Sequence, residues 1–432
     1  MFRYLPKNMN GILAVEKPSG VSLSLVVLQL QALFDTLDVF AADRAALKEK
    51  VHTELTQGTK WLAQKIANRV KKAKIKVGHG GTLDPLALGV LIVGVGLGTK
   101  KLNYYLGECT KTYETRAVLG QLTTTGDAEG EVVTQTETAG VTLPQLRTAA
   151  AKFVGKIRQT PPIYSALKVD GKPLYEYARE GIPVPRAIKP REVLVHLFEV
   201  HDDFGPNERF GALKCSSAGD SMGAAVFNNP TLNDHVLCYS EEFMARTDVE
   251  EAEKNADIRP KLIDPAHVIS LPPVFHATAS VGSGTYIRSL VSDLGRAVGL
   301  LAFMAELVRT KQADWELGKN VFKLSDFTDR DQRIWGPVLK RVFDAGADVL
   351  LAEEFDKVEG VILPLIEKER LEKGRLESES AACDENEVIG KDTKEQEVEA
   401  LAEGKQKGLA EEIDGEATDR PDDVKRRKVE DM

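Results

Sequence analysis

The stretch Gly78–Gly98 constrains the fold more than any other part of the chain, because seven of its 21 residues are glycine. Glycine lets a backbone adopt unusual dihedral angles and approach another group closely. Within it, Leu88–Val95 contains only aliphatic residues and glycine, which predicts a buried strand. Asp84 precedes this run and is followed by Pro85, so its backbone is biased toward an extended conformation. We predict a rigid loop that projects the Asp84 carboxylate; the alternative from local features is a carboxylate that caps a turn.

The charge of the 432-residue chain is concentrated in its C-terminal tail. Residues 367–432 carry 13 Lys/Arg and 22 Asp/Glu, which accounts for the whole net charge of −9 and leaves the rest of the chain neutral. This tail has no aromatic residue and few aliphatic ones, so it cannot bury enough surface to offset the entropy lost on ordering. We predict a disordered acidic tail, and a neutral body that does not exclude a nucleic-acid partner.

Several classes of protein are excluded by what the chain lacks. No run approaches the ~20 apolar residues of a membrane span, so we expect no membrane partner. The first ten residues have no apolar segment of the kind found in secretory signals, which favours a reducing intracellular compartment. The four cysteines show no C-x-x-C spacing and the histidines no ligand spacing, so we expect neither a disulfide framework nor a metal. The cysteines are Cys109, Cys215, Cys238 and Cys383.

Apolar periodicity predicts strands and helices in mixed order along the chain. The predicted strands are Gly11–Val15, Leu88–Val95, Tyr113–Leu119, Glu131–Thr136 and Val274–Val281. The predicted helices are Ser22–Phe34, Leu143–Val154 and Tyr286–Val298, with a helix-prone segment at 36–76. Residues 202–265 are polar and then acidic, which indicates an insertion that is partly loop.

Two further segments carry side chains suited to catalysis or RNA contact. Arg288 lies at the start of a predicted helix, where a guanidinium can pair with a carboxylate; the alternative is a solvated surface arginine. Gln159–Lys168 and Leu174–Arg179 mix aromatic rings with cations, a combination that stacks on bases and binds phosphates. Taken alone this second signal is weak, because such residues are common in loops.

Seven blocks of the sequence, in this order, resemble the TruB class of tRNA pseudouridine synthases, and most closely its eukaryotic, fungal-type members. The blocks are Asn10–Gly20, Gly78–Leu91, Lys111–Glu114, Gln159–Lys168, Leu174–Gly181, Gly284–Leu290 and Leu307–Thr310. They cover neither the 36–75 and 202–265 expansions nor the tail. The PUA-like module that ends the bacterial members is not apparent after Asn320.

This resemblance implies the architecture of the chain. The family fold is α+β, a long mixed and mostly antiparallel sheet flanked by helices, with a central catalytic cleft. On this basis we expect a catalytic domain over residues 1–330, with insertions at about 36–75 and 202–265. A C-terminal helical extension over 331–366 and the acidic tail over 367–432 follow it.

The resemblance also implies a role for each matching residue. Asp84 matches the catalytic aspartate that acts as nucleophile on the target uridine, and Arg288 matches the arginine that ion-pairs with it. Tyr113 matches the tyrosine that stacks on the flipped base and takes part in late proton transfer. The implied substrate-binding residues are His79, Lys17, Lys168, Tyr164, Leu307 and Arg309; among them Leu307 lines the uracil pocket and His79 reshapes the RNA loop.

The implied reaction isomerises a uridine, and the residue types suit it. The N1–C1′ glycosidic bond breaks, the base rotates and a C5–C1′ bond forms, so we expect neither a metal nor a redox cofactor. A carboxylate can add covalently to the nucleoside or abstract a proton, and an arginine holds it ionised. The base must leave the loop stack, which requires an aromatic surface in the pocket.

The expected substrate is the T-loop uridine at tRNA position 55, with mRNA sites of similar loop shape in addition, and we expect the enzyme to act as a monomer. One alternative is an RNA-guided rRNA synthase subunit; another is a non-catalytic RNA-folding chaperone. Lys60–Lys76 holds seven Lys/Arg and no acid, with Leu62, Ile66 and Val70 on one stripe. It is predicted either to grip phosphates beside the target loop or to be an ordinary solvated helix face.

Two short basic segments bear on localisation. Lys425–Lys428 resembles a nuclear-import signal, and its alternative is a counter-charge within the acidic tail. Met1–Asn8 has basic character and no acid, which suits either an organelle-targeting segment or a frayed terminus. We expect import machinery as a partner and a nuclear location, with a mitochondrial pool as a further hypothesis.

Overall fold

The computed structural model describes residues 8–58, 61–206, 208–210, 237–255, 258–264 and 271–376. The chain divides into two units, Met1–Ile362 and Leu363–Met432, and the division falls within the expected extension 331–366. The expected import signal Lys425–Lys428 and all but the last residue of the expected targeting segment Met1–Asn8 lie outside the described residues.

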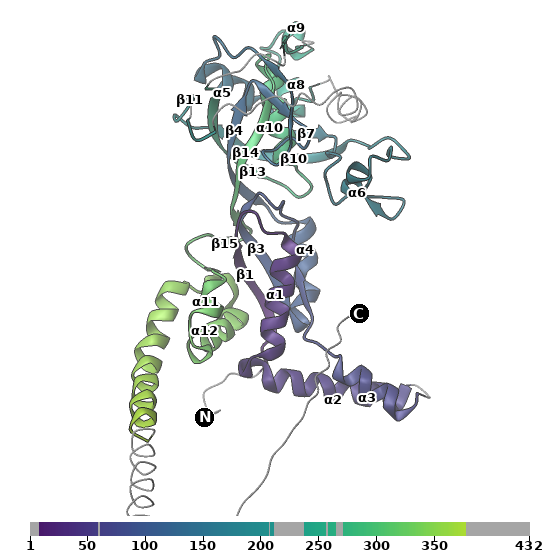
Figure 1. The fold of residues 1–432 in the computed structure, drawn as a ribbon. Helices are drawn as coiled ribbons and strands as arrows, with labels where there is room; N and C mark the ends of the chain where they lie inside the picture. The colour runs from purple at the N-terminus through teal and green to yellow at the C-terminus, as the bar shows by residue number, and fades with distance from the viewer. Residues whose placement is uncertain are drawn as a thin grey trace, which may run out of the picture. The chain divides into compact units, whose positions relative to one another are not determined.

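An eleven-stranded sheet runs through the first unit (Figure 1). Its strands are β1 (Gly11–Lys17), β2 (Val77–His79), β3 (Leu88–Val95), β4 (Lys111–Leu119), β7 (Gly155–Gln159), β10 (Arg191–Val200), β11 (Gly205–Pro206), β13 (Pro273–Val281), β14 (Ala302–Gln312), β15 (Trp315–Glu316) and β16 (Val321–Phe322). Eight follow in the order β16-β1-β3-β14-β4-β13-β10-β7, while β2, β11 and β15 pair with β3, β13 and β14. Only β1–β16 and β3–β14 are parallel among these pairs, so the expected mixed, mostly antiparallel sheet is confirmed.

Two small sheets accompany the large one. Strands β5 (Gln121–Thr123), β6 (Val132–Thr136) and β12 (Leu262–Ile263) form the first, and β8 (Lys168–Val169) with β9 (Lys172–Pro173) forms the second. The turn between β8 and β9 is Asp170-Gly171, and both residues have positive φ, 51° and 83°. Two such residues make the tight turn that matches the twist of a hairpin.

Helices flank the large sheet. They are α1 (Leu23–Thr36), α2 (Ala41–Gly58), α3 (Ala63–Lys71), α4 (Leu102–Gly107), α5 (Leu143–Ala151), α6 (Leu174–Arg179), α8 (Glu241–Met244), α9 (Glu251–Lys254), α10 (Ile287–Ala297), α11 (Ser325–Thr328) and α12 (Gln332–Ala345), with short 3₁₀ turns at Asp38–Phe40 (η1) and Gly96–Lys101 (η2). Because α1 packs against β2, α12 against β1 and α10 against β14, the central strands are buried on both faces. This explains why β3 is a continuous apolar run rather than an alternating one.

The tail differs from the expectation at its start. A helix runs over residues 351–376, so 367–376 are helical rather than without regular structure. Side-chain pairs along the helix, Lys368 with Glu372 and Arg370 with Glu367, support this continuation. The rest of the predicted tail, 377–432, lies outside the described residues.

Within the segment 202–265, the described residues include loops and short helices, and α8 packs against β7 of the sheet. The backbone N–H of Lys156 on β7 donates a hydrogen bond to Glu242 Oε2 on α8, 2.8 Å away. Among the described residues no single helix is long and apolar enough to cross a membrane; α1 and Asp38–Gly58 meet those criteria only as a pair bent by 76°.

Candidate active site

The loop that carries Asp84 connects β2 to β3 and is fixed at both ends. At its start Gly80 donates from its backbone N–H to the Ile92 carbonyl at 2.8 Å. At its end Gly89 has φ +118° and lies against β14, where an added Cβ would sit 2.3 Å from the Arg309 carbonyl oxygen. Only glycine fits this contact, so the glycine-dense stretch brings β14 directly beside the loop.

Lys17 supports the same loop at the turn formed by Asp84 and Pro85. Its side chain is fully buried, and Nζ donates to the carbonyls of Pro18, Val21 and Pro85 at 2.7, 2.8 and 2.9 Å. Burial lowers the pKa of Lys17 to about 8, although the carboxylates of Glu129 and Asp84 raise it. The structure therefore differs from the expectation that Lys17 contacts RNA: all three ammonium donors are already used by backbone carbonyls, one of them next to Asp84.

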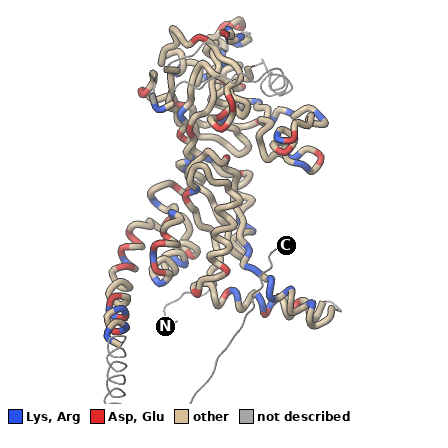
Figure 2. The backbone as a smooth tube through the Cα atoms, in the orientation of Figure 1, with Lys and Arg blue, Asp and Glu red and all other residues tan. Residues whose placement is uncertain are grey.

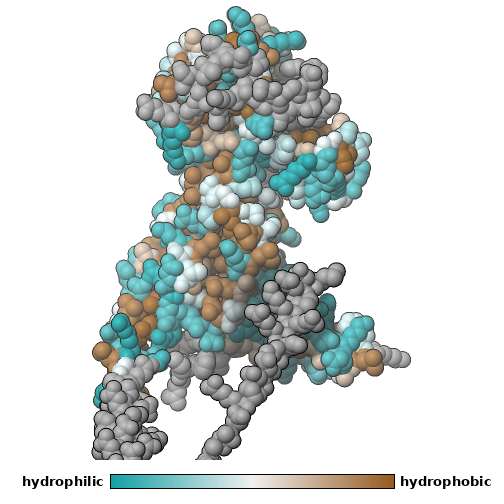
Figure 3. Space-filling view, in the orientation of Figure 1, coloured by the Kyte–Doolittle hydropathy of each residue, from teal (hydrophilic) through white to brown (hydrophobic). Residues whose placement is uncertain are grey.

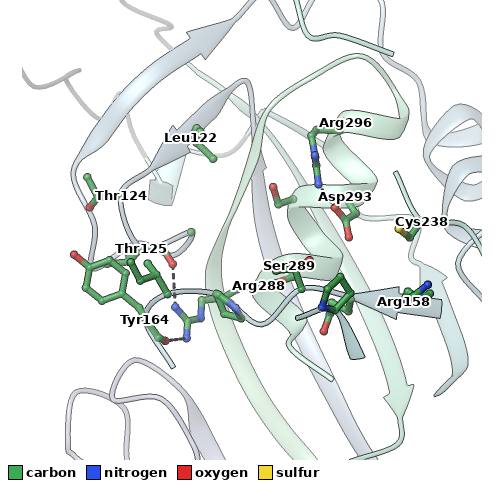
Figure 4. A pocket seen from close by; sticks show the side chains of 17 residues that line it. Leu122, Thr124, Thr125, Arg158, Tyr164, Cys238, Arg288, Ser289, Asp293 and Arg296 are labelled. Atoms are coloured by element: carbon green, nitrogen blue, oxygen red, sulfur yellow. Dashed lines mark hydrogen bonds and ion pairs between the residues drawn. The ribbon is translucent and has the colours of Figure 1, made fainter. Parts of the chain in front are cut away.

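Arg288 meets Asp84 from the first turn of α10. Its Nε lies 3.0 Å from Asp84 Oδ2, while Nη1 donates to the Thr125 carbonyl at 2.9 Å and Nη2 to the Tyr164 carbonyl at 2.6 Å (Figure 4). The side chain of Arg288 is only 6% exposed. An arginine whose donors are fixed by backbone carbonyls presents its charge to the carboxylate in one orientation.

The protonation of Asp84 is set by opposing influences. Burial raises the pKa of its carboxyl above the ordinary value, the charge of Arg288 lowers it, and the nearby Asp127 carboxylate raises it again. Asp127 is itself buried, and its Oδ2 lies 3.7 Å from Nη1 of Arg288. A carboxyl group with a perturbed pKa and a dedicated cation, placed in a cavity, is the usual signature of a reacting group.

Asp84 and Arg288 line a cavity that is partly open to solvent. Tyr113 on β4 and Leu307 on β14 also line it, so the structure brings together four residues separated by more than 200 positions. The wall is completed by Thr82, Leu83, Ser165, Ala166, Thr285, Tyr286 and Ile287. A wall that combines aliphatic and hydroxyl side chains with one carboxylate and two tyrosines suits a planar, everted base.

Arg309 lies behind Tyr113 and not in the cavity wall. It is fully buried; Nε donates to the Val90 carbonyl at 2.6 Å, and Nη1 donates to the Thr82 carbonyl at 3.1 Å. Nη1 also lies 3.5 Å from the Tyr113 hydroxyl. Arg309 was expected to contact the substrate, but its donors, like those of Lys17, are bound within the protein. They link the loop that carries Asp84, strand β3 and Tyr113.

The remaining expected substrate-binding residues are at the periphery. His79 ends β2, is half-buried, and burial lowers its pKa below the ordinary value. Lys168 is exposed at the start of β8. The Tyr164 carbonyl binds Arg288, and Tyr164 lines a second cavity to which Arg288 also contributes (Figure 4). None of these three lines the cavity that holds Asp84.

Sequence reasoning missed two residues that position Arg288. Asp127 follows Gly126, and an aspartate after glycine is ordinary turn chemistry, so no local pattern marks it as part of a site. Gln159 accepts a hydrogen bond from the Tyr286 backbone N–H at 2.7 Å and donates to the Tyr286 carbonyl at 3.1 Å, which fixes the start of α10. The sequence did contain a signal for Gln159, because this residue opens one of the seven blocks that resemble the family.

Comparison with known proteins gives the family. Residues 68–218 match the TruB family pseudouridylate synthase N-terminal domain. The chain is 42% identical over 361 residues to tRNA pseudouridine synthase 4 of Saccharomyces cerevisiae, which covers 81% of this chain and 89% of that relative. The chain belongs to the TruB family of pseudouridine synthases. As a TruB family member it is an isomerase, which confirms the enzyme class expected from the sequence.

Other TruB family relatives show the same pattern at lower identity. The Schizosaccharomyces pombe protein named tRNA pseudouridine synthase 4 is 32% identical over 349 residues, 74% of this chain and 82% of that relative. A tRNA pseudouridine synthase B of Streptococcus pyogenes is 34% identical over 255 residues, 59% of this chain and 65% of that relative. A solved Cbf5-Nop10-Gar1 complex matches with TM-score 0.39 and 18% identity, covering 81% of this chain but 59%, less than two thirds, of that one.

Proposed function

We propose that this chain converts the T-loop uridine of tRNA, position 55, into pseudouridine, with Asp84 as the catalytic carboxylate and without a guide RNA. The observation that carries the proposal is the ion pair between Asp84 Oδ2 and Arg288 Nε, 3.0 Å, in the wall of a cavity shared with Tyr113. The names of the fungal relatives, both tRNA pseudouridine synthases, support tRNA as the substrate class.

The geometry suits each step of the isomerisation. The target base leaves the loop stack and enters the cavity, where the Tyr113 ring replaces the lost stacking and Leu307 provides an apolar wall. The Asp84 carboxylate, held ionised by Arg288, attacks the nucleoside or abstracts a proton. The N1–C1′ bond breaks, the base turns and the C5–C1′ bond forms; where Asp84 has bonded to the nucleoside, that bond breaks as well, so the free carboxylate is regenerated. C5 then loses its proton and N1 is protonated, so the product is an isomer of the substrate.

The Tyr113 hydroxyl is the group we assign to the late proton transfer. Tyr113 lines the cavity, and its hydroxyl accepts a hydrogen bond from Nη1 of the buried Arg309 at 3.5 Å, which orients the oxygen for proton transfer. His79 and Lys168, outside the cavity, are proposed to contact the RNA around the target base. The same surface would accept mRNA hairpins with a loop of similar shape.

The test uses purified protein and a stem-loop RNA that carries only the T arm, with no other RNA present. Chemical mapping after incubation is expected to show pseudouridine at the target position with wild type and none with Asp84→Ala. Lack of product with wild type until a guide RNA is added would favour an RNA-guided subunit. Product from Asp84→Ala would remove Asp84 from the mechanism, and RNA refolding without product from either protein would favour a chaperone.

A further inference from the structure

Residues 61–76, which we call the basic arm, carry charge that the catalytic site does not use. Figure 2 shows Lys and Arg gathered on α3 and on the segment that follows it. The described basic residues of the arm are Lys65, Arg69, Lys71, Lys72, Lys74 and Lys76, and no Asp or Glu occurs between Glu54 and Asp84. All six basic residues are exposed. Residues 1–366 are neutral only when the arm is counted; without its six cations they hold 38 Lys/Arg against 44 Asp/Glu, so the arm is a local concentration of positive charge.

The arm is anchored to α1, although most of its cations have no carboxylate partner among the described residues. Ile66 and Ile75 are buried, and the Ile75 backbone N–H donates to Asp35 Oδ1 on α1 at 3.0 Å. Gln31 Nε2 donates to the Ile75 carbonyl at 3.0 Å. A frayed basic segment would lose conformational entropy on binding a ligand, whereas one anchored on both sides of Ile75 presents its cations without that loss.

The cations of α3 are arranged for an external anion. Lys65, Arg69 and Lys72 recur at helical spacing and share one face, beside the stripe formed by Ile66 and Val70. Within the part of the chain that the structure describes, Lys74 pairs with Asp35 at 3.9 Å, but no carboxylate lies within 4 Å of Lys65, Arg69, Lys71 or Lys72. Figure 3 shows the same region as mainly hydrophilic, which suits a charged ligand better than an apolar one.

The arm joins the sheet at the end of β3 that is far from Asp84, which corrects the expectation that the arm lies beside the target loop. The chain leaves the arm at Lys76 and enters β2, and Val77 pairs with Val95 at the far end of β3 from Asp84. β3 has eight residues, which at ~3.3 Å each separates its two ends by roughly 25 Å. Lys100 and Lys101 on η2 add two exposed cations at this far end, where the Gly96 N–H donates to the Lys76 carbonyl.

We infer that the basic arm, with Lys100 and Lys101, is a second RNA-binding surface that takes the phosphates of a double-stranded stem of the same RNA whose loop enters the cavity. The inference rests on the proposed function for the identity of that RNA. Lysine and arginine rows without base-reading groups bind the phosphate backbone and give salt-dependent, sequence-independent affinity. The arm joins the sheet at the far end of β3, a strand roughly 25 Å long, so a stem must extend well beyond the target loop to reach it, and the surface would favour whole tRNA over a short T-arm stem-loop.

The test compares two RNAs and two triple variants. The first variant is Arg69→Ala, Lys71→Ala and Lys72→Ala. The matched control removes three exposed lysines that each pair with a carboxylate four residues away, Lys50→Ala, Lys357→Ala and Lys368→Ala. Dissociation constants are measured over a salt series for full-length tRNA and for the isolated T-arm stem-loop, together with single-turnover rates and melting temperatures.

For full-length tRNA the arm variant is expected to bind about tenfold more weakly at low salt, with a log–log salt slope shallower by about three units. The control variant and every measurement on the stem-loop should match wild type. Unchanged tRNA binding by the arm variant would overturn the inference, and so would an equal loss on both RNAs, because that would place the arm at the loop. If wild type converts neither RNA, the proposed function fails. The comparison of tRNA binding by wild type and the arm variant then decides whether the arm binds RNA.

Discussion

Asp127 Oδ2 lies 3.7 Å from Nη1 of Arg288, the arginine whose Nε binds Asp84. Arg288 is therefore shared between two carboxylates, one that faces the cavity and one that is buried behind it. Asp127 is in turn fixed by the Thr125 hydroxyl and by the Glu129 backbone N–H. In this position Asp127 orients the guanidinium of Arg288. The negative charge of Asp127 also raises the pKa of Asp84.

Replacing Asp127 by Asn should lower activity and move its pH dependence. Loss of the buried carboxylate releases Arg288 from its orientation, and we expect kcat to fall by about tenfold or more. Because Asp127 raises the pKa of Asp84, its removal lowers that pKa, so the acid limb of the kcat/KM profile should shift to lower pH. Single-turnover rates across the acid range measure both effects. An acid limb that stays in place or moves to higher pH would contradict this coupling.

Lys17→Met tests whether the lysine supports the loop or binds RNA. The substitution leaves three buried carbonyls without their donor, and we expect a loss of stability of about 2–4 kcal/mol together with a lower kcat. The salt dependence of RNA binding should match wild type, because the ammonium does not reach phosphate. Denaturant melts and a salt series separate the two roles: unchanged stability with a slope shallower by about one unit would assign Lys17 to the RNA.

Gly89→Ala tests the close contact between the loop and β14. The added Cβ would meet backbone at 2.3 Å, so β14 must move, and we expect a loss of about 3 kcal/mol or more. Gly171→Ala is the control, since Gly171 also has positive φ but its Cβ would meet nothing within 4 Å; a cost of about 1–2 kcal/mol is expected there. Chemical denaturation measures both free energies of unfolding. An equal loss of stability in the two variants would show that Gly89 is required by its backbone conformation and not by the contact with β14.

Tyr113→Phe separates the ring from the hydroxyl. The ring still faces the cavity, so RNA affinity should be retained, while loss of the hydroxyl that we propose for proton transfer should lower the single-turnover rate by about 10²-fold. Tyr113→Leu should weaken RNA binding as well, because it removes the stacking surface. A wild-type rate from the phenylalanine variant would limit Tyr113 to a role in packing.

Much of the fold was predictable because its signals are local. The apolar run of β3 and the spacing of α10 appear in the sequence as they do in the structure. The helix predicted at Leu143–Val154 begins at the same residue as α5, since Thr142 and Gln145 form a capping box. The helix at 367–376 was missed because composition gives no account of a helix that continues from 351.

Some residues of the site were predicted correctly and others were not, and the difference depends on burial. Asp84, Tyr113, Arg288 and Leu307 meet in one cavity, as the family resemblance implied. The resemblance assigned Lys17 and Arg309 to substrate binding, but both are fully buried, which is unusual for lysine and arginine. Which carbonyls they bind depends on contacts between segments far apart in sequence, and no local pattern records those.

The central claim, that Asp84 performs the chemistry while Arg288 holds it ionised, is tested most directly by the single-turnover rate of Asp84→Asn on T-arm RNA, measured beside its RNA affinity. The amide preserves shape but cannot act as nucleophile or base. We predict a rate at least about 10⁴-fold below wild type with an unchanged dissociation constant. Pseudouridine formation within about tenfold of the wild-type rate would contradict the account.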